Sequence, residues 1–221
     1  MRYPFIAYSP KVALNPLFKG LKGEPLILDM SVEGHVFAGV DVRDQREYQR
    51  RIDWLMAEGS HGWGISSYLE NREKLLADCP QMVQEQRFYH LGIDIIVPLG
   101  TPLHAPLAAT IETSGYEAGE GNYGGYVLLR HQSPDFETFF SFYGHLRPDT
   151  LPAQGMSVQA GEIFAHIGDF NENGNWFYHT HLQVITELGI TQGYLSKGYC
   201  AAEDLAFMDR LCPTPLPFFR T

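Results

Sequence analysis

From residue 86 onward the chain consists of short β-branched and aromatic runs separated by glycine and proline. Examples are "FYHLGIDIIVP", "GGYVLLRH", "TFFSFYGHL" and "HTHLQVIT". Runs of this length, bounded by turn residues, are typical of strands that pair with their neighbours in sequence. The sequence therefore predicts a mainly β protein, with an antiparallel sheet at its centre and a few appended helices.

Helical patterns occur on both sides of this β region. Residues 44–58 repeat apolar side chains every three or four positions and end at a glycine, and residues 67–78 carry leucines between a serine and Pro80. Both patterns predict amphipathic helices. A third, shorter helix is expected at about residues 201–211, before a proline-rich end.

These patterns divide the chain into three parts. We expect an N-terminal extension over residues 1–85, a β domain over 86–190, and a C-terminal helix with a proline-rich tail over 191–221. The run "EPLILDM" in the extension is a candidate for an added strand. We also hypothesise that the extension lies across a functional cleft as an inhibitory lid.

Composition excludes several function classes. The formal net charge of −10 disfavours binding to nucleic acid or to an anionic membrane. The three cysteines are far apart and form no C-x-x-C pair, so reduced thiols are expected rather than a disulfide framework. Prolines interrupt the N-terminus before a secretory signal could form, and no apolar run is long enough to span a bilayer, which predicts a cytoplasmic protein.

The stretch "HLGID" places an imidazole, a glycine and a carboxylate at alternate positions. Glycine, β-branched residues and a closing proline disfavour a helix here, so His90, Gly92 and Asp94 are expected on one face of a strand. Gly92 would leave room between the two functional side chains. By the same alternation, His179 and His181 of "HTHLQVIT" project side by side.

Two imidazoles and a carboxylate are a known ligand set for catalytic Zn²⁺, with a fourth position open. His90, Asp94 and one of His179 or His181 can supply it. Neither short motif is specific by itself, so the prediction depends on their strand contexts. Three polar groups that face one point in a sheet are costly to bury without a partner.

Five motifs in order resemble the lysostaphin/LytM-type zinc endopeptidases, which cut peptidoglycan cross-bridges. They are "HLGIDIIVPLGTPLHAP", "YGGYVLLRH", "FYGHL", "VQAGEIFAHIGD" and "HTHLQV", and they cover about residues 87–187. The resemblance implies the antiparallel sandwich or half-barrel fold of that family. It also implies a zinc-dependent hydrolase acting on peptidoglycan-type peptides.

Carried over position by position, the resemblance implies His90, Asp94 and His181 as the zinc ligands. It places His145 and His179 beside the attacking water, as the residues that move protons and stabilise the oxyanion. No H-E-x-x-H glutamate is present, and imidazoles can serve as the acid and base instead. Which histidine is the general base stays open.

The sequence departs from the family pattern just before and within the last motif. Tyr178 replaces a proline and Gln183 replaces a glutamate, but no ligand is lost. The loop residues Asn122, Tyr123 and Trp176 are expected to line the substrate cleft. The run "GEGNYG" leads straight into a strand and is interpreted as a turn, not as a dinucleotide-binding loop.

Other polar residues have simpler interpretations. His131 and His166 interrupt apolar strands and are expected to be hydrogen-bonded structural histidines. Glu70 and Arg72 are expected to form an exposed charged pair on a solvated helix face.

The leading hypothesis is a zinc metalloendopeptidase with Zn²⁺ as cofactor and a peptide as partner. One alternative is a non-catalytic LytM-like regulatory or binding module. The presence of all five ligand and catalytic positions argues against it. Another is a carrier or phosphotransfer half-barrel, which would leave Asp94 unexplained and for which no lysine-bearing turn is present.

Overall fold

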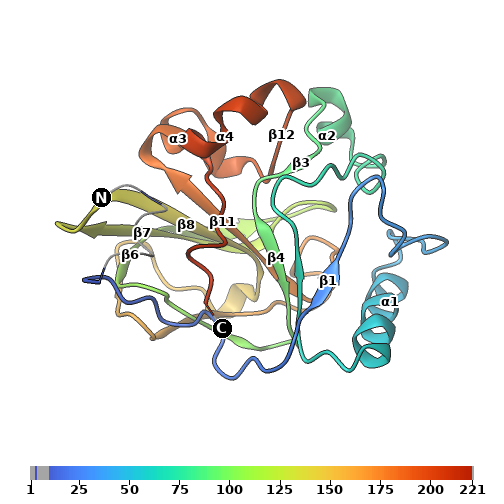
Figure 1. Ribbon diagram of the computed structural model, residues 1–221, viewed down its shortest axis with the longest axis horizontal. Coiled ribbons are helices and arrows are strands. Elements are labelled where there is room, and N and C mark those ends of the chain that lie inside the picture. The colour runs from blue at the N-terminus through green and yellow to red at the C-terminus, as the bar shows by residue number, and fades with distance from the viewer. Residues whose placement is uncertain (1–2, 4–9, 221) are drawn as a thin grey trace.

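The computed structural model describes residue 3 and residues 10–220 of the chain. An eight-stranded sheet crosses the molecule, with helical segments gathered at one end and a longer helix at one side (Figure 1). The order of its strands is β1 (Leu26–Leu28), β2 (Gly64–Ser66), β4 (Ile93–Ile96), β11 (His179–Thr186), β8 (Phe136–Leu146), β7 (Gly124–Ser133), β6 (Ala109–Glu117) and β9 (Ser157–Val158).

Two smaller sheets complete the β structure. They pair β10 (Ile163–His166) with β5 (Pro102–His104), and β12 (Tyr199–Cys200) with β3 (Tyr89–His90). All strand pairings in the described part of the chain are antiparallel except the parallel pair of β1 and β2. This confirms the predicted mainly β, antiparallel fold class. The run "EPLILDM" does supply an edge strand, β1.

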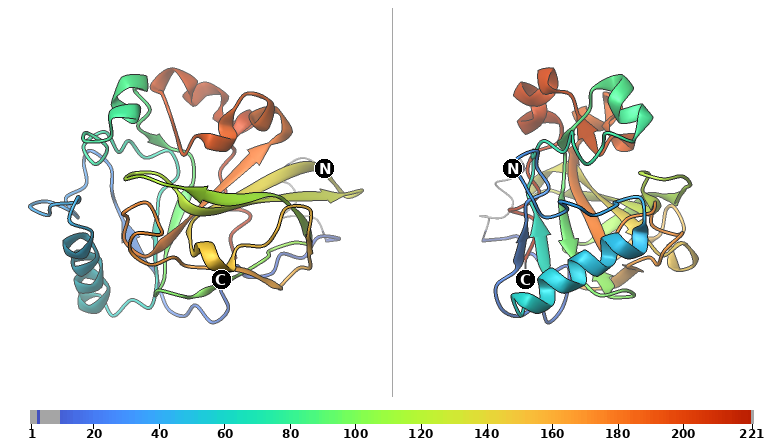
Figure 2. Two further views of the ribbon diagram at one scale, coloured as in Figure 1. Left: turned by 180° about the vertical axis from the view of Figure 1, so that it is seen from behind. Right: turned by 90° about the vertical axis from the view of Figure 1, so that its right-hand side faces the viewer.

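Buried apolar side chains form a main core and two smaller clusters. The main core joins inward-facing residues of β4, β7, β8 and β11 to residues from both ends of the chain: Leu17, Phe18, Phe218 and Phe219. A second cluster lies beneath the helix α1 (Gln45–Glu58), which packs at the β1–β2 end of the sheet (Figure 2). Described segments of the first 85 residues are therefore part of the same sheet and the same cores as the strands that follow.

The predicted helix over residues 44–58 is confirmed as α1. Asp44 caps its first turn by accepting hydrogen bonds from the backbone N–H groups of Arg46 and Glu47, and the helix ends at Gly59. At the other end of the chain, a 3₁₀ segment (Ala202–Phe207) leads into α4 (Met208–Leu211), close to the expected helix at 201–211. Two further short helical segments, α3 (Glu187–Thr191) and the 3₁₀ turn Tyr194–Ser196, precede them.

The predicted helix over residues 67–78 is wrong. Leu69 has a positive φ of 59°, and the first part of this segment bonds to the backbone of β3 and its neighbours, leaving only a turn at Arg72–Leu76 among residues 67–78. Leu69 N–H donates to His90 O, and Arg72 N–H donates to Phe88 O. The helix α2 starts at Pro80 and runs to Glu85, because proline suits the first turn of a helix better than its interior.

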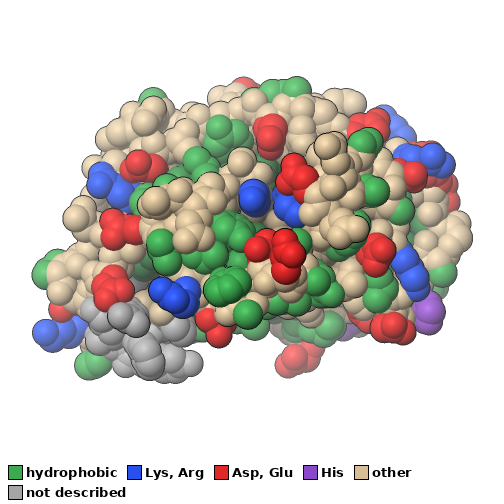
Figure 3. Space-filling model, turned by 90° about the horizontal axis from the view of Figure 1, so that it is seen from above, with side chains coloured by type: hydrophobic (Ala, Val, Ile, Leu, Met, Phe, Trp, Pro, Cys, Tyr) green, Lys and Arg blue, Asp and Glu red, His purple; other side chains and the backbone are tan. Residues whose placement is uncertain are grey.

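Two observations concern the outside of the molecule. Among the described residues, no helix combines the length and the apolarity needed to cross a bilayer. The face that carries α2 and the C-terminal helical segments mixes acidic, basic and hydrophobic side chains (Figure 3). Among the described residues, that face offers no broad patch of one charge.

Leu182 provides a test of the main core. Its side chain is fully buried in β11, directly after His181. We expect Leu182→Ala to lower the free energy of unfolding by about 3 kcal/mol, because it leaves a cavity that the sheet cannot close. Leu188→Ala, at a side chain that is 40% exposed, should cost less than about 1 kcal/mol in the same urea titration. Equal losses in the two variants would contradict this assignment of the core.

Candidate metal centre

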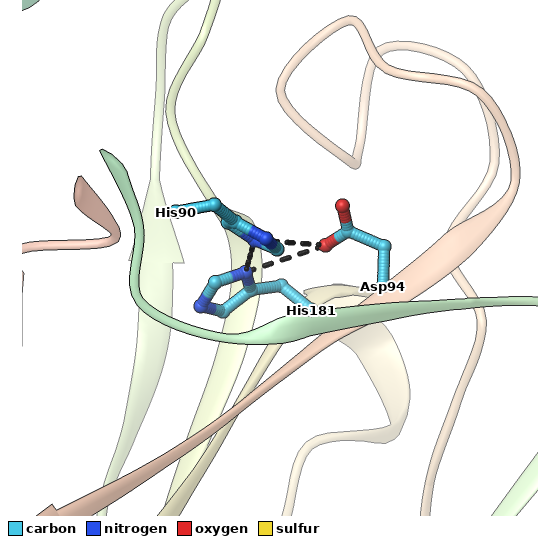
Figure 4. A group of neighbouring side chains, drawn as sticks. All are labelled: His90, Asp94 and His181. Atoms are coloured by element: carbon cyan, nitrogen blue, oxygen red, sulfur yellow. Dashed lines mark hydrogen bonds and ion pairs between the residues drawn. The ribbon is translucent and has the colours of Figure 1, made fainter. Parts of the chain in front are cut away.

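Two adjacent antiparallel strands bring a carboxylate and two imidazoles together. In the register of β4 and β11, His181 lies opposite Asp94 and His179 lies opposite Ile96. His90 reaches the same point from β3 (Figure 4). The Nε2 atom of His90 is 3.3 Å from Asp94 Oδ1 and 2.9 Å from His181 Nδ1, and His181 Nδ1 is 3.4 Å from Asp94 Oδ1.

The path of the chain between His90 and Asp94 differs from the single strand that was expected. The strand breaks at Leu91 and Gly92, and β3 pairs with β12 outside the main sheet. Gly92 is nevertheless essential to the packing. A Cβ on it would lie 2.5 Å from Leu182 O and 2.6 Å from His181 Cε1. The space left by the missing side chain is filled by the His181 ring.

The four imidazoles at this point are all oriented by an acceptor on their outer side. His90 Nδ1 lies 3.2 Å from Ser67 O, and His179 Nδ1 lies 2.8 Å from Phe177 O. His145 Nδ1 lies 2.8 Å from Asn173 O. A carbonyl oxygen only accepts hydrogen bonds, so each of these outer nitrogens carries the proton. In these three rings the inner Nε2 atom is therefore unprotonated and presents its lone pair to the centre.

His181 is oriented in the opposite sense, with Nε2 outward. Its Nε2 lies 3.1 Å from Gln183 Oε1, while the Gln183 amide nitrogen donates to Lys197 O and Cys212 Sγ. The amide oxygen therefore faces His181, and Nδ1 of that ring is the free lone pair. Gln183, which stands where the family pattern has a glutamate, makes this orienting contact.

His145 reaches the centre because β8 contains a bulge. Gly125 pairs with Leu146 and Val127 with Tyr143, so Gly144 and His145 together face a single residue of β7. His145 has a φ of 63°, a conformation that is unusual for a residue with a side chain. The bulge turns its ring toward His179, with the ring centroids 4.3 Å apart.

Arg72 holds the other oxygen of Asp94. Its Nη2 lies 2.7 Å from Asp94 Oδ2 and 2.6 Å from Glu70 Oε1, and the Arg72 and Asp94 side chains are each 2% exposed. Ser66 adds contacts to both Arg72 and the Asp94 carboxylate. The expectation of a solvated Glu70–Arg72 pair is wrong, because residues 67–78 fold against β3 and not as a surface helix.

These surroundings set the protonation states. Burial opposes ionisation of Asp94, but the Arg72 charge and the surrounding imidazoles hold the pKa of that carboxyl well below its usual range. Burial, with the nearby Arg72 charge, lowers the pKa of His90 to about 3. Burial also lowers the pKa of His179 to about 4 and holds that of His145 well below its usual range. Near pH 7 the centre thus holds a carboxylate together with neutral His90, His145 and His179.

This set of donors fits a divalent metal ion. With their outer nitrogens protonated, the inner nitrogens of His90 and His181 lie 2.9 Å apart and both present a lone pair, so a cation fits between them. Tetrahedral ligands about 2.0–2.2 Å from Zn²⁺ lie about 3.3–3.6 Å apart, which matches both contacts to Asp94 Oδ1. His90, Asp94 and His181 are therefore a candidate metal site.

A cavity of about 120 Å³ opens at this centre. Asp94, His145, His179 and His181 line it, and so do the three residues expected in the cleft, Asn122, Tyr123 and Trp176. Two buried polar atoms on its wall, Tyr123 Oη and Trp176 Nε1, have no hydrogen-bond partner among the described residues.

The helix α1 supports the loop that carries Trp176. Gln45 Nε2 donates to Trp176 O and to Asn173 Oδ1, at 2.7 and 2.8 Å. Asn173 in turn supplies the carbonyl that orients His145. The helix thereby helps to position one wall of the cavity together with a candidate catalytic histidine. Sequence periodicity predicted the helix but gave no sign of this contact.

Two other histidines, the cysteines and the glycine-rich run supply none of the candidate metal ligands. His131 is buried and its Nε2 lies 2.7 Å from Ser141 Oγ, as expected of a structural histidine. His166 has a buried Nδ1 without a partner among the described residues, so the expected hydrogen bond is not seen there. The three cysteines are free, and "GEGNYG" lies in the turn between β6 and β7.

Residues 88–190 match the model of peptidase family M23. The match includes His90, Asp94, His145, His179 and His181. The match covers just under half of the chain, and it confirms the resemblance seen in the five motifs. Arg72 and Ser66, which hold Asp94, lie outside the matched residues.

The chain is also similar to a curated protein and to several solved structures. A protein of Haemophilus influenzae described as an uncharacterized metalloprotease is 31% identical over 126 residues, which are 55% of this chain and 25% of that protein. Solved structures similar to this chain include a zinc containing peptidase from Vibrio cholerae (24% identity, 44% of this chain and 27% of that one, TM-score 0.33). They also include lysostaphin from Staphylococcus simulans (20% identity, 59% and 43%, TM-score 0.36). The chain spans about a quarter of the length of the curated relative.

Gly92→Ala tests the packing of the centre. We expect this change to weaken Zn²⁺ binding at least about tenfold, because the new methyl group collides with the His181 ring and displaces a ligand. Binding is measured by competition with a chromogenic zinc chelator. Gly62→Ala is the control, since its added Cβ meets only an atom 3.6 Å away. An unchanged affinity in Gly92→Ala would contradict the predicted role of that contact.

Arg72→Lys tests the positioning of Asp94. Lysine keeps the charge but lacks the planar fork that holds Asp94 and Glu70 together, so we expect at least about tenfold weaker Zn²⁺ binding. Arg130→Lys, at a half-exposed ion pair with Glu112, should leave the affinity unchanged. Thermal melting of both variants shows whether the fold is retained. A folded Arg72→Lys protein with wild-type affinity would show that Arg72 has no part in the site.

Proposed function

We propose that this protein is a zinc-dependent metalloendopeptidase that hydrolyses peptide bonds, with peptidoglycan-type peptides as its substrates. The observation that carries the proposal is the convergence of four imidazole lone pairs and one oxygen of Asp94 at the wall of a cavity. His90, Asp94 and His181 would hold the ion, and neutral nitrogen ligands with one carboxylate suit Zn²⁺. Bound Zn²⁺ supplies Lewis acidity that polarises the scissile carbonyl and lowers the pKa of a water.

The two remaining histidines are assigned to the proton transfers. His145 and His179 are neutral near pH 7, and their outer nitrogens are fixed by backbone carbonyls. Each ring therefore presents one basic nitrogen toward the cavity. One imidazole takes the proton of the attacking water, and the imidazolium that forms stabilises the oxyanion or protonates the leaving amine.

The unpartnered groups of the cavity wall are suited to bind a peptide backbone. Trp176 Nε1 is a donor that lies beside His145 and His179, and Tyr123 Oη is both a donor and an acceptor. A peptide carbonyl would satisfy the indole N–H. The family match and the resemblance to lysostaphin/LytM-type enzymes support peptidoglycan-type peptides as the substrate class.

The test separates metal binding from turnover. Asp94→Ala and His181→Ala should lose bound metal, measured by mass spectrometry of the purified proteins. His145→Ala and His179→Ala should retain the metal and lose at least about 100-fold in turnover on muropeptides or on glycine-rich and D-amino-acid peptides. His35→Ala, at an exposed histidine, is the control and should retain both properties.

Two outcomes would overturn the proposal. Metal retained in both Asp94→Ala and His181→Ala would rule out the ligand assignment. A wild-type protein that binds Zn²⁺ but cleaves none of these peptides would favour the alternative, a LytM-like regulatory or binding module.

A further inference from the structure

The cavity wall carries an arginine that the metal centre does not use. Arg87 lies between α2 and β3, and its side chain is only 11% exposed. Its backbone N–H donates to Met82 O of α2. The side chain is held at two points: Nε pairs with Glu85 Oε2 at 2.6 Å, and Nη1 lies 3.4 Å from Tyr199 O. The guanidinium is thereby fixed at the cavity, which it lines together with the ligands Asp94 and His181.

Part of this guanidinium is not committed within the described part of the chain. Glu85 engages Nε, is 54% exposed and does not line the cavity. Tyr199 O accepts only a long bond from Nη1. Among the described residues Nη2 makes no hydrogen bond or ion pair, so this arginine has N–H donors available to a ligand.

Tyr123 lines the same cavity as Arg87, and its hydroxyl lies beside Gly198 and Tyr199, the segment that contacts Arg87. A Cβ on Gly198 would be 2.7 Å from Tyr123 Oη, and Gly198 directly precedes Tyr199, whose carbonyl contacts Arg87. The hydroxyl is buried and has no partner among the described residues. A buried hydroxyl without a partner is costly, which indicates that a ligand supplies the missing bond.

The charges that line the cavity favour one small anion. Arg72 is already paired with Asp94 and Glu70, so Arg87 is the arginine of the lining whose charge has no buried counterpart. Glu117 also lines the cavity and has no ion pair among the described residues, and its charge would repel a multiply charged group such as a phosphate. A guanidinium N–H beside a phenolic O–H matches the two oxygens of a carboxylate.

We propose that Arg87 and Tyr123 bind a free carboxylate of the substrate close to the scissile amide, so that the enzyme prefers peptides with this carboxylate over their amidated forms. This inference rests on the proposed function, for which it defines the substrate more closely. The small volume of the cavity suits the end of a peptide chain or a short branch that ends in a carboxylate.

The experiment compares matched peptides that differ only in this group. Short peptides and muropeptides that the zinc-loaded enzyme cleaves are prepared as free acid and as carboxamide, and kcat/KM is measured for both. The wild type should prefer the acid at least about tenfold, the size expected of a charge-assisted hydrogen bond in a partly buried site. Arg87→Gln should bring the ratio of acid to amide close to one.

Two variants show whether the effect belongs to the guanidinium at the cavity. Glu85→Gln removes the ion pair of Arg87 without removing its charge, and should keep the preference for the acid. Arg130→Gln removes another arginine of a carboxylate pair, away from the cavity, and should also keep it. If both Arg87→Gln and Glu85→Gln lost the preference for the acid, the preference would depend on the packing of α2, and the proposal would be overturned.

Binding without turnover gives a second measurement. Isothermal titration of the zinc-loaded protein with N-acetyl-glycylglycine and with its carboxamide should show tighter binding of the acid, and Arg87→Gln should remove the difference. Equal cleavage and equal binding of acid and amide in the wild type would overturn this inference and leave the proposed function intact. Absence of cleavage of every peptide would overturn the proposed function instead, and the titration alone would then decide the role of Arg87.

Discussion

The buried charge of Asp94 is the constraint on which the rest of the centre depends. A carboxylate that is 2% exposed is stable only if both of its oxygens have strong partners. Arg72 and Ser66 satisfy Oδ2, and Oδ1 faces only imidazole nitrogens. Because those nitrogens present lone pairs and no protons to Oδ1, the space between them and the carboxylate suits a cation. The same interaction therefore fixes the fold locally and defines the chemistry.

Segments outside residues 88–190, the part that matches the family model, build a large part of this centre. Arg72, Ser66 and Gln45 come from the first 85 residues, and Tyr199 comes from the C-terminal part. β1 and β2 extend the same sheet that carries the ligands. These segments are structural parts of the site. The hypothesis that the N-terminal extension acts as an inhibitory lid stays a prediction. Described residues near the start, such as Leu17 and Phe18, pack in the main core.

Two local features position the histidines with a precision that a regular strand would not provide. The bulge at Gly144 and His145 lets one residue of β8 turn into the cavity. The missing side chain of Gly92 lets the His181 ring approach the backbone of the adjoining strand. Both features depend on glycine and occur where the strand pattern is interrupted. Local irregularity of this kind is typical of functional sites.

The sequence by itself determined the elements whose signals are local. Alternation predicted the strands, periodicity and a cap predicted α1, and ordered motifs predicted the domain and the residues that converge at the centre. Tertiary structure alone decided what depends on contacts between distant segments. Residues 67–78 have a helical pattern, yet they pair with β3, because burying Arg72 against Asp94 satisfies groups that a surface helix would leave exposed. The positions of Arg72 and Arg87 at the cavity depend on such long-range contacts, and no local pattern in the sequence encodes them.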